Sequence, residues 1–218
     1  MMRGTSLCLI LGFLAAVTCS SPLRRSLVIV CAGDSLTEQG YPRFLKRILR
    51  DNGFNARVLN YGRSGSTSAE YLKFLDQKKL AMEADHPDAI LLSLGTNDVR
   101  LDGDRTGTPE FRRNLERIIA ILRGFRDRRG KPTLLLLATV PPIPEIVRFP
   151  FGPESRKRIE NEINPVIRQL VLDNNLPLAD NYALFLVSPQ LLPGVHPTDE
   201  GYKLMAENWF RTLGKVLK

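Results

Sequence analysis

Leu27-Val28-Ile29-Val30-Cys31 is an unbroken apolar run that leads through Ala32 into Gly33-Asp34-Ser35-Leu36. A run of this length, rich in β-branched residues and followed by a turn signal, is typical of a strand buried on both faces. Further apolar segments recur along the chain at 56–60, 89–94, 133–139 and, more weakly, 176–179. Since helix-like stretches separate these segments, the pattern predicts a parallel sheet.

The intervening stretches carry apolar residues at helical spacing. Thr108 and Thr198 each precede an acidic first turn and are predicted N-caps, whereas Gly53 and Gly130 are placed to end helices. The expected fold class is α/β, a three-layer α/β/α sandwich in which helices cover both faces of a central, mostly parallel five-stranded sheet. The expected helices run over about 42–52, 69–75, 109–128, 155–174 and 199–217.

Residues 1–21 differ in composition from the rest of the chain. Arg3 gives a positive start, 7–17 is apolar and small residues follow, which is the pattern of a secretory signal peptide. The apolar run is shorter than the ~20 residues that cross a bilayer as a helix, so no stable membrane span is expected. We therefore expect one domain at 22–218 in a secreted or periplasmic protein, with lipid attachment at Cys19 as the minor alternative.

The chain has few residues that could form a disulfide or bind a metal. Removal of residues 1–21 would take Cys8 and Cys19 with it and leave Cys31 alone. No disulfide within the chain is then possible, so stability must come from a hydrophobic core. No His, Cys or Asp cluster has the spacing of metal ligands, and we expect neither a metal nor a cofactor.

The formal net charge is +8, and such a balance can attract polyanions. Basic residues nevertheless fall at helical spacing beside apolar ones, as in 43–50 and 112–123, which favours solvated helix faces. No basic stripe is interleaved with aromatic residues, so nucleic acid is not an expected partner.

Polar residues follow the expected strands where the strands end. Ser35 follows the first strand, Gly65 the second and Asn97 the third, and the carboxyl ends of parallel strands face one crevice. A serine hydroxyl needs a base to become a good nucleophile, and the chain has two histidines. His86 precedes a strand and is expected in a surface loop, and His196 lies near the C-terminus.

Four stretches carry a recognisable pattern: Gly33-Asp34-Ser35-Leu36-Thr37, Asn60-Tyr61-Gly62-Arg63-Ser64-Gly65-Ser66-Thr67, Gly95-Thr96-Asn97-Asp98, and Gly194-Val195-His196-Pro197 leading into Gly201-Tyr202. In this order they resemble the motifs of the GDSL esterase and lipase family, also called SGNH hydrolases. The resemblance covers nearly all of 22–218 and implies a flavodoxin-like fold and ester hydrolysis. It implies that Ser35 is the nucleophile, that His196 is the base, and that Ser35, Gly65 and Asn97 form the oxyanion hole.

These residue types suit the chemistry. The backbone N–H groups of Ser35 and Gly65 and the Asn97 amide can stabilise a tetrahedral oxyanion. Structural interpretations stand beside the functional ones. Ser35 could cap a helix, but the next helix signal, at Pro42, starts too late. Gly62 could shape a turn, and Asp98 could cap a helix.

The chain departs from the family pattern before His196. The family usually has an aspartate three residues before the histidine, and here Pro193 occupies that position. Either a backbone carbonyl orients His196, or Asp199 or Asp180 does so. Loss of the orienting acid can cost on the order of 10⁴ in turnover in a serine triad.

The preferred function is a secreted serine hydrolase that cleaves short-chain acyl esters, such as O-acetyl groups on carbohydrate, through an acyl-serine. Its partner would be a small-molecule or polysaccharide ester. The rigid segments 141–144 and 148–151 could wall an acyl or sugar pocket, and no long insertion could form a lid. The alternatives are a lysophospholipase or acyl-thioesterase, a catalytically impaired relative that binds acylated sugar or lipid, and a nucleotide-binding domain. The last lacks a glycine fingerprint and a Walker lysine.

Overall fold

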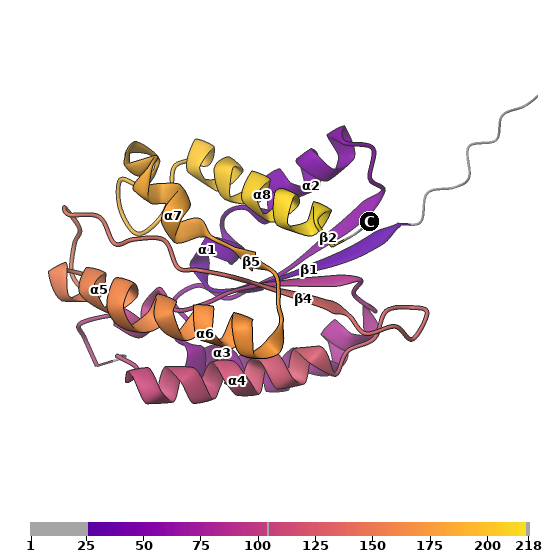
Figure 1. Ribbon diagram of the computed structural model, residues 1–218, viewed down its shortest axis with the longest axis horizontal. Coiled ribbons are helices and arrows are strands. Elements are labelled where there is room, and N and C mark those ends of the chain that lie inside the picture. The colour runs from indigo at the N-terminus through magenta and orange to yellow at the C-terminus, as the bar shows by residue number, and fades with distance from the viewer. Residues whose placement is uncertain (1–25, 104, 217–218) are drawn as a thin grey trace, which may run out of the picture.

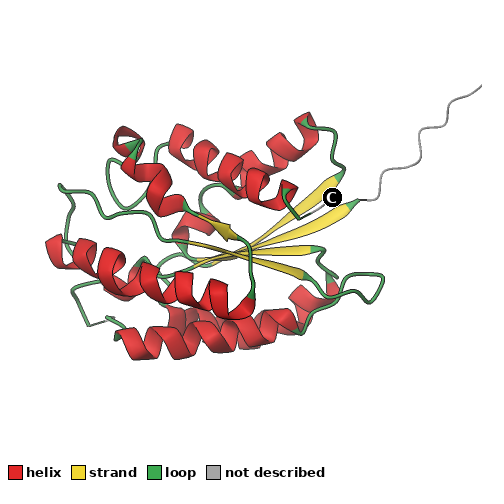
Figure 2. Ribbon diagram, viewed as in Figure 1, coloured by secondary structure: helices red, strands yellow, loops and turns green. Residues whose placement is uncertain are grey.

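In the computed structural model, which describes residues 26–103 and 105–216, five strands form one twisted sheet (Figure 2). Their order is β2-β1-β3-β4-β5 and every neighbouring pair is parallel. The order reverses between β1 and β3, and ligands in such folds bind beyond the carboxyl ends of the strands at this point. The strands are β1 (Leu27–Gly33), β2 (Ala56–Gly62), β3 (Ala89–Ser93), β4 (Leu134–Ala138) and β5 (Leu178–Ala179).

Helices cover both faces of the sheet, as predicted (Figure 1). One face carries α1 (Ser35–Glu38), α2 (Pro42–Asp51), α7 (Asn181–Leu186) and α8 (Asp199–Gly214). The other carries α3 (Ser68–Ala84), α4 (Thr108–Arg123), α5 (Pro153–Arg158) and α6 (Asn164–Asn174). Two short 3₁₀ helices, η1 (Asn97–Val99) and η3 (Pro189–Leu191), lie in loops.

The central strand β1 divides its side chains between two cores. Ile29 and Cys31 pack with the α2 and α8 side, whereas Val30 and Ala32 pack with the α3, α4 and α6 side. Successive residues of a strand point to opposite faces, so an unbroken apolar run is what a sheet covered on both faces requires. Each large apolar side chain buried in this way contributes about 1.5–3 kcal/mol.

Some helix ends differ from the prediction. Thr198 caps α8 as expected, and Gly53, with φ +77°, follows α2. Thr108 does not cap α4, because Gly107 takes that position and the Thr108 hydroxyl donates to Glu162. The prediction for Gly130 is also wrong, since α4 already ends at Arg123 and Gly130 lies in a later turn, where its N–H donates to Asp127.

Two helices were underestimated from the sequence. α3 continues to Ala84, beyond the predicted limit at residue 75, and Met82 in this extension is fully buried. α7 was not predicted, because its six residues are too few to show a helical period. It begins where the Asp180 side chain accepts a hydrogen bond from the Ala183 N–H at 3.2 Å.

The predicted helix over 155–174 is interrupted by a π-helical turn, η2 (Ile159–Ile163), between α5 and α6. Pro165 follows this turn and has no N–H to donate to the preceding turn, which accounts for the change in hydrogen bonding. Asn164 next to it bonds both backbone groups of Val140, at 2.8 and 3.0 Å. These two hydrogen bonds attach the start of α6 to the segment that follows β4.

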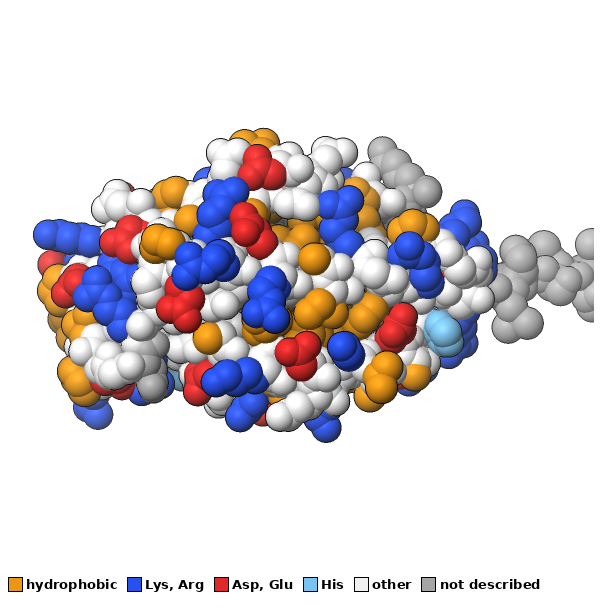
Figure 3. Space-filling model, turned by 90° about the horizontal axis from the view of Figure 1, so that it is seen from below, with side chains coloured by type: hydrophobic (Ala, Val, Ile, Leu, Met, Phe, Trp, Pro, Cys, Tyr) orange, Lys and Arg blue, Asp and Glu red, His pale blue; other side chains and the backbone are white. Residues whose placement is uncertain are grey.

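The expected signal peptide at 1–21 lies outside the described residues, and among those described no helix is long and apolar enough to cross a membrane. Charges of both signs are interleaved on the face drawn in Figure 3. On α4, for example, Arg112 pairs with Glu116 and with Asp173 of α6. This arrangement agrees with solvated helix faces.

Gly62 provides a test of the packing between β2 and α1. A Cβ at this position would lie 2.3 Å from the Glu38 nitrogen and 2.7 Å from its Cα, and both atoms are backbone. We predict that Gly62→Ala lowers the free energy of unfolding by about 1–3 kcal/mol. Urea denaturation measures this change.

Gly214→Ala is the matched control, because nothing lies within 4 Å of its added Cβ. It should leave stability unchanged or raise it by up to about 1 kcal/mol. Equal midpoints and slopes for Gly62→Ala and the wild type would show that β2 does not approach α1 as described.

Candidate active site

Ser35 is the first residue of α1, directly after the central strand. A helix does begin here, contrary to the expectation that the first helix starts near Pro42. The cap is Asp34, whose side chain accepts from the Leu36 N–H at 3.0 Å. Burial raises the pKa of Asp34 to about 7. Ser35 therefore lies at the positive end of a helical turn and keeps only 7% of its surface exposed.

His196 and Ser35 lie together although 161 positions separate them. The His196 Nε2 atom is 2.8 Å from the Ser35 Oγ atom. The loop that carries His196 is held by α8, since Thr198 caps that helix and a Cβ on Gly201 would lie 2.6 Å from the Leu191 carbonyl oxygen. An imidazole nitrogen at this distance can accept the hydroxyl proton.

No carboxylate of the described chain bonds the other side of the His196 ring. Asp199 forms an ion pair with Arg43 of α2. Asp180 accepts from Thr139 and Arg168, each at 2.8 Å. Neither candidate acid bonds His196, and partial burial alone lowers the pKa of His196 from its ordinary value of 6.5. The Ser35–His196 pair is thus a dyad within residues 26–103 and 105–216.

Gly65 lies in a tight turn after β2. The Ser66 N–H reaches the Arg63 carbonyl oxygen at 3.3 Å and Gly65 has φ +76°, which is the geometry of a type II turn that requires glycine at its third position. The space around Gly65 is open, with no heavy atom within 4 Å of an added Cβ. Backbone conformation, not crowding, therefore demands glycine here.

Two contacts bind this turn to the segment that carries Ser35. The Arg63 N–H donates to the Gly33 carbonyl at 2.8 Å. Glu38 accepts from the Ser64 N–H at 3.0 Å and also from the Ser64 hydroxyl. The Ser35 and Gly65 N–H groups have no acceptor among the described residues. Both donors are thereby free for a ligand.

Asn97 is the first residue of η1 and is 6% exposed. Its Nδ2 atom donates to the Ser66 carbonyl at 3.0 Å, which ties it to the Gly65 turn. An amide nitrogen has two hydrogens, so one stays available. The next residue, Asp98, accepts from the Ser68 N–H at 3.0 Å at the start of α3, which agrees with its interpretation as a helix-capping residue.

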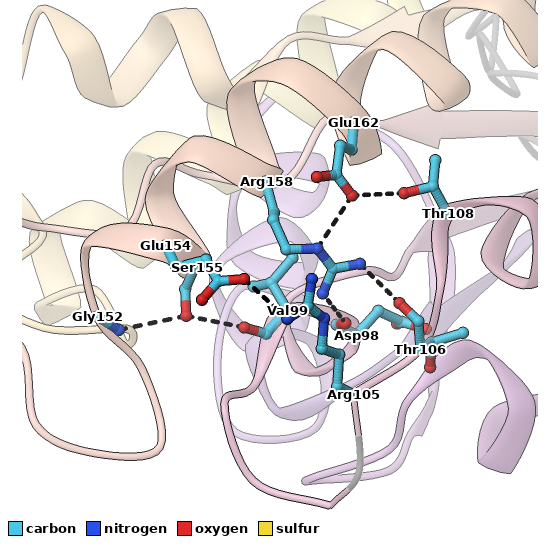
Figure 4. A network of polar contacts seen from close by, with 10 residues as sticks. All are labelled: Asp98, Val99, Arg105, Thr106, Thr108, Gly152, Glu154, Ser155, Arg158 and Glu162. Carbon is cyan, nitrogen blue, oxygen red and sulfur yellow. Dashed lines mark hydrogen bonds and ion pairs between the residues drawn. The ribbon is translucent and has the colours of Figure 1, made fainter.

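Arg158 holds the segment after Asn97 (Figure 4). It is 2% exposed and donates to the carbonyls of Asp98 at 2.8 Å and Thr106 at 2.6 Å. Its Nε atom donates to Glu162 at 3.0 Å. Partial burial would raise the pKa of Glu162, but its bonds to Thr108 and Arg158 lower the pKa below its ordinary value. The buried cation is therefore paired, and it joins two parts of the segment that connects β3 to α4.

The structure thus brings Ser35, His196, Gly65 and Asn97 to one edge of the sheet. His86 lies apart, exposed between α3 and β3. The sequence did not predict the supporting roles of Glu38 and Arg158, because no motif spacing reveals which backbone groups they contact. Gly62 proves to be a position of close backbone approach.

The described chain contains no group of three or more His, Cys, Asp or Glu side chains placed to hold a metal ion. The arrangement offers a serine hydroxyl next to an imidazole, together with N–H donors from the backbone and from the Asn97 amide. That combination suits attack on a carbonyl carbon and stabilisation of the resulting oxyanion.

Comparison with known proteins gives similar chains. An acetylxylan esterase of Xylanibacter ruminicola is 28% identical, and the match covers 86% of this chain and 43% of the relative. A multidomain esterase of Ruminococcus flavefaciens is 32% identical over 61% of this chain and 16% of that protein. The chain thus spans less than half the length of these relatives.

Solved structures are also similar. The lipase/acylhydrolase of Enterococcus faecalis has a TM-score of 0.69 at 28% identity, covering 87% of this chain and 96% of the other. An acetylxylan esterase of Geobacillus stearothermophilus has a TM-score of 0.72 at 18% identity, covering 88% and 97%, which shows the shared fold.

The family comparison covers the elements that carry all four motifs. The match to the model of the GDSL-like lipase/acylhydrolase family extends over residues 31–204, from within β1 into α8. The chain belongs to the GDSL-like lipase/acylhydrolase family.

Proposed function

We propose that the protein is a secreted serine ester hydrolase that removes short acyl groups, in particular O-acetyl groups from carbohydrate. The observation that carries the proposal is the 2.8 Å contact between Ser35 Oγ and His196 Nε2. A nucleophile beside a base, at the carboxyl edge of a parallel sheet, is the arrangement that covalent ester hydrolysis needs.

In the proposed reaction His196 Nε2 takes the Ser35 proton as the Ser35 oxygen bonds to the ester carbonyl carbon. The tetrahedral oxyanion accepts hydrogen bonds from the Ser35 and Gly65 N–H groups and from the Asn97 amide. When it collapses, the bond to the alcohol oxygen breaks and His196 returns the proton to that oxygen. Water, deprotonated by His196, then releases the acid and regenerates Ser35.

The preference for short acyl groups on carbohydrate rests on two supports. Among the residues that the structure describes, no long insertion covers the site. The acetylxylan esterase of Xylanibacter ruminicola stands among the similar proteins. Cleavage of lysophospholipids or acyl thioesters is the alternative, and export rests on the sequence pattern of residues 1–21.

A second candidate function follows from the missing acid. Pro193 offers no carboxylate to His196, and neither Asp199 nor Asp180 bonds His196. A protein with this dyad could bind an acylated sugar or lipid without hydrolysing it. Measurable turnover that disappears in His196→Ala would exclude this candidate.

Ester hydrolysis itself is tested with 4-nitrophenyl esters from acetate to decanoate and with acetylated xylan. We predict turnover highest for acetate, and a loss of at least about 10³-fold in Ser35→Ala because no acyl-serine can form. A Ser188→Ala control, changed at the N-cap of η3, should keep full activity. Equal rates for Ser35→Ala and the wild type would refute the proposal, and a preference for octanoate or longer would refute the short-chain specificity.

Glu38 is predicted to position the Gly65 N–H. The Ser64 N–H that Glu38 binds belongs to the Arg63–Ser64 peptide, whose carbonyl accepts from the Ser66 N–H and closes the turn. Without the Glu38 bond this peptide can tilt, which shifts the Gly65 N–H away from the oxyanion. We expect Glu38→Ala to lower kcat about tenfold with little change in KM. Glu38→Gln, which keeps an acceptor oxygen, should stay within about threefold of the wild type.

The matched control for Glu38 is Glu110→Ala, which changes an exposed first-turn glutamate of α4. Steady-state kinetics and urea denaturation on the same preparations separate positioning from folding. If Glu38→Ala changes stability but not kcat, its contact does not orient the donor.

The absence of a carboxylate predicts how activity depends on pH. Neutral His196 is the active form, and its pKa is lowered below 6.5, so kcat/KM should fall only at pH values below that. A carboxylate within about 4–6 Å favours the charged imidazole and raises its pKa. Pro193→Asp should therefore move the acid limb to higher pH and raise kcat on the plateau by at least about tenfold.

Pro193→Asn is the uncharged control and should leave the acid limb in place. The measurement is kcat/KM for 4-nitrophenyl acetate between pH 4 and 9. An acid limb and plateau that are the same in Pro193→Asp and the wild type would mean that position 193 does not communicate with His196.

A further inference from the structure

A cavity of about 470 Å³ lies next to the loop that carries His196. One side is formed by 146–151, in the segment that follows β4, and the other by 193–195, which immediately precede His196. The cavity is thus built from two loops far apart in sequence, one of which also carries the proposed base.

The cavity has an apolar floor and an exposed wall. Val147, Phe151 and Val195 pack against the core on the α3, α4 and α6 side of the sheet. Phe149, by contrast, keeps 74% of its surface exposed and Ile146 keeps 88%. Large aromatic side chains are usually buried, whereas the Phe149 ring is open to solvent beside an apolar cavity. Exposed apolar residues grouped around a cavity in this way mark binding sites.

The segment that forms the wall is anchored at both ends. Arg156 donates to the carbonyls of Ile143 and Pro144, each at 2.9 Å. The Leu101 N–H donates to the Pro150 carbonyl at 2.7 Å. The backbone that carries the Phe149 ring is therefore held in place. A ligand that binds there would lose little binding free energy to the ordering of this segment.

The position of the cavity relates it to one part of an ester. In the proposed reaction His196 Nε2 returns its proton to the departing alcohol oxygen, so that alcohol must lie on the His196 side of the site. The strand order puts the Gly65 turn after β2 and the 146–151 segment after β4, on opposite sides of β1 and Ser35. The Gly65 N–H and the cavity therefore lie on opposite sides of Ser35.

We propose that this cavity is the subsite for the leaving alcohol and that it takes a pyranose ring stacked against Phe149. This inference rests on the proposed ester hydrolysis and names the substrate class of that site. The C–H face of a pyranose is apolar and packs on an aromatic ring, while its hydroxyls need donors and acceptors at the edge. Arg148, exposed at the cavity, has five N–H donors for that edge.

The test varies the alcohol and the acyl group separately. Xylose tetraacetate and ethyl acetate share the acetyl group and differ in the alcohol, whereas ethyl octanoate and ethyl acetate share the alcohol. Phe149→Leu keeps an apolar side chain without a ring, and Phe149→Trp keeps a ring. Leu80→Ala is the control, because Leu80 is also 74% exposed and lies on α3 away from the cavity.

We expect Phe149→Leu to lower the ratio of kcat/KM for xylose tetraacetate to that for ethyl acetate at least fivefold, mainly through KM. The ratio for ethyl octanoate to ethyl acetate should not change. Phe149→Trp and Leu80→Ala should retain both ratios. A fall in the octanoate ratio alone would assign the cavity to the acyl chain, and no change in either ratio would mean that it binds neither; both results overturn the inference.

Binding to the Ser35→Ala protein tests the subsite independently of turnover. Titration with xylose tetraacetate, followed by NMR, should give a Kd at least fivefold weaker when Phe149→Leu is added. An unchanged Kd overturns the inference even if ester hydrolysis is real. If the wild type hydrolyses no ester but Phe149→Leu still weakens binding, the proposed function fails and the sugar subsite stands.

Discussion

The parallel pairing of β1 with β3 is the constraint on which the rest of the site depends. Because both strands run in the same direction, their carboxyl ends meet, and Ser35 and Asn97 emerge side by side from the centre of the sheet. The pairing of β1 with β2 brings the Gly65 turn to the same edge. His196 is the exception, since it comes from the loop before α8 and reaches Ser35 from one of the covering layers.

Loops at this edge of the sheet can position functional groups accurately only if hydrogen bonds hold the loop backbones in place. Here charged and amide side chains bind backbone groups: Arg158 holds the carbonyls after Asn97, Glu38 holds the N–H before Gly65, and Asn164 holds both groups of Val140. Each of these contacts satisfies a backbone group that would otherwise be left without a partner. The proposed oxyanion donors thus have fixed positions before any ligand arrives, which is the condition for electrostatic stabilisation without reorganisation.

The fold could be predicted because its central strands are mainly apolar, as 27–31 and 134–137 show, and because the long helices keep a helical spacing of apolar residues. Ser35, Gly65 and Asn97 share one edge because each follows a strand, whereas His196 comes from the loop before α8. What could not be predicted depends on contacts distant in sequence. α1 begins at Ser35 through a single cap by Asp34, Thr108 bonds Glu162 instead of capping, and Gly130 serves a turn and not a helix end. Glu38 and Arg158 act through backbone groups, which no residue pattern reports.

The proposed reaction requires that His196 activates Ser35 as a nucleophile. This requirement can be tested by reaction of the protein with an alkyl fluorophosphonate, followed by intact mass measurement and peptide mapping, because only an activated serine displaces fluoride. We expect one phosphonyl adduct, located on Ser35, and at least about 10²-fold slower labelling in His196→Ala. An adduct on another residue, or equally fast labelling of Ser35 without His196, would show that His196 does not activate Ser35.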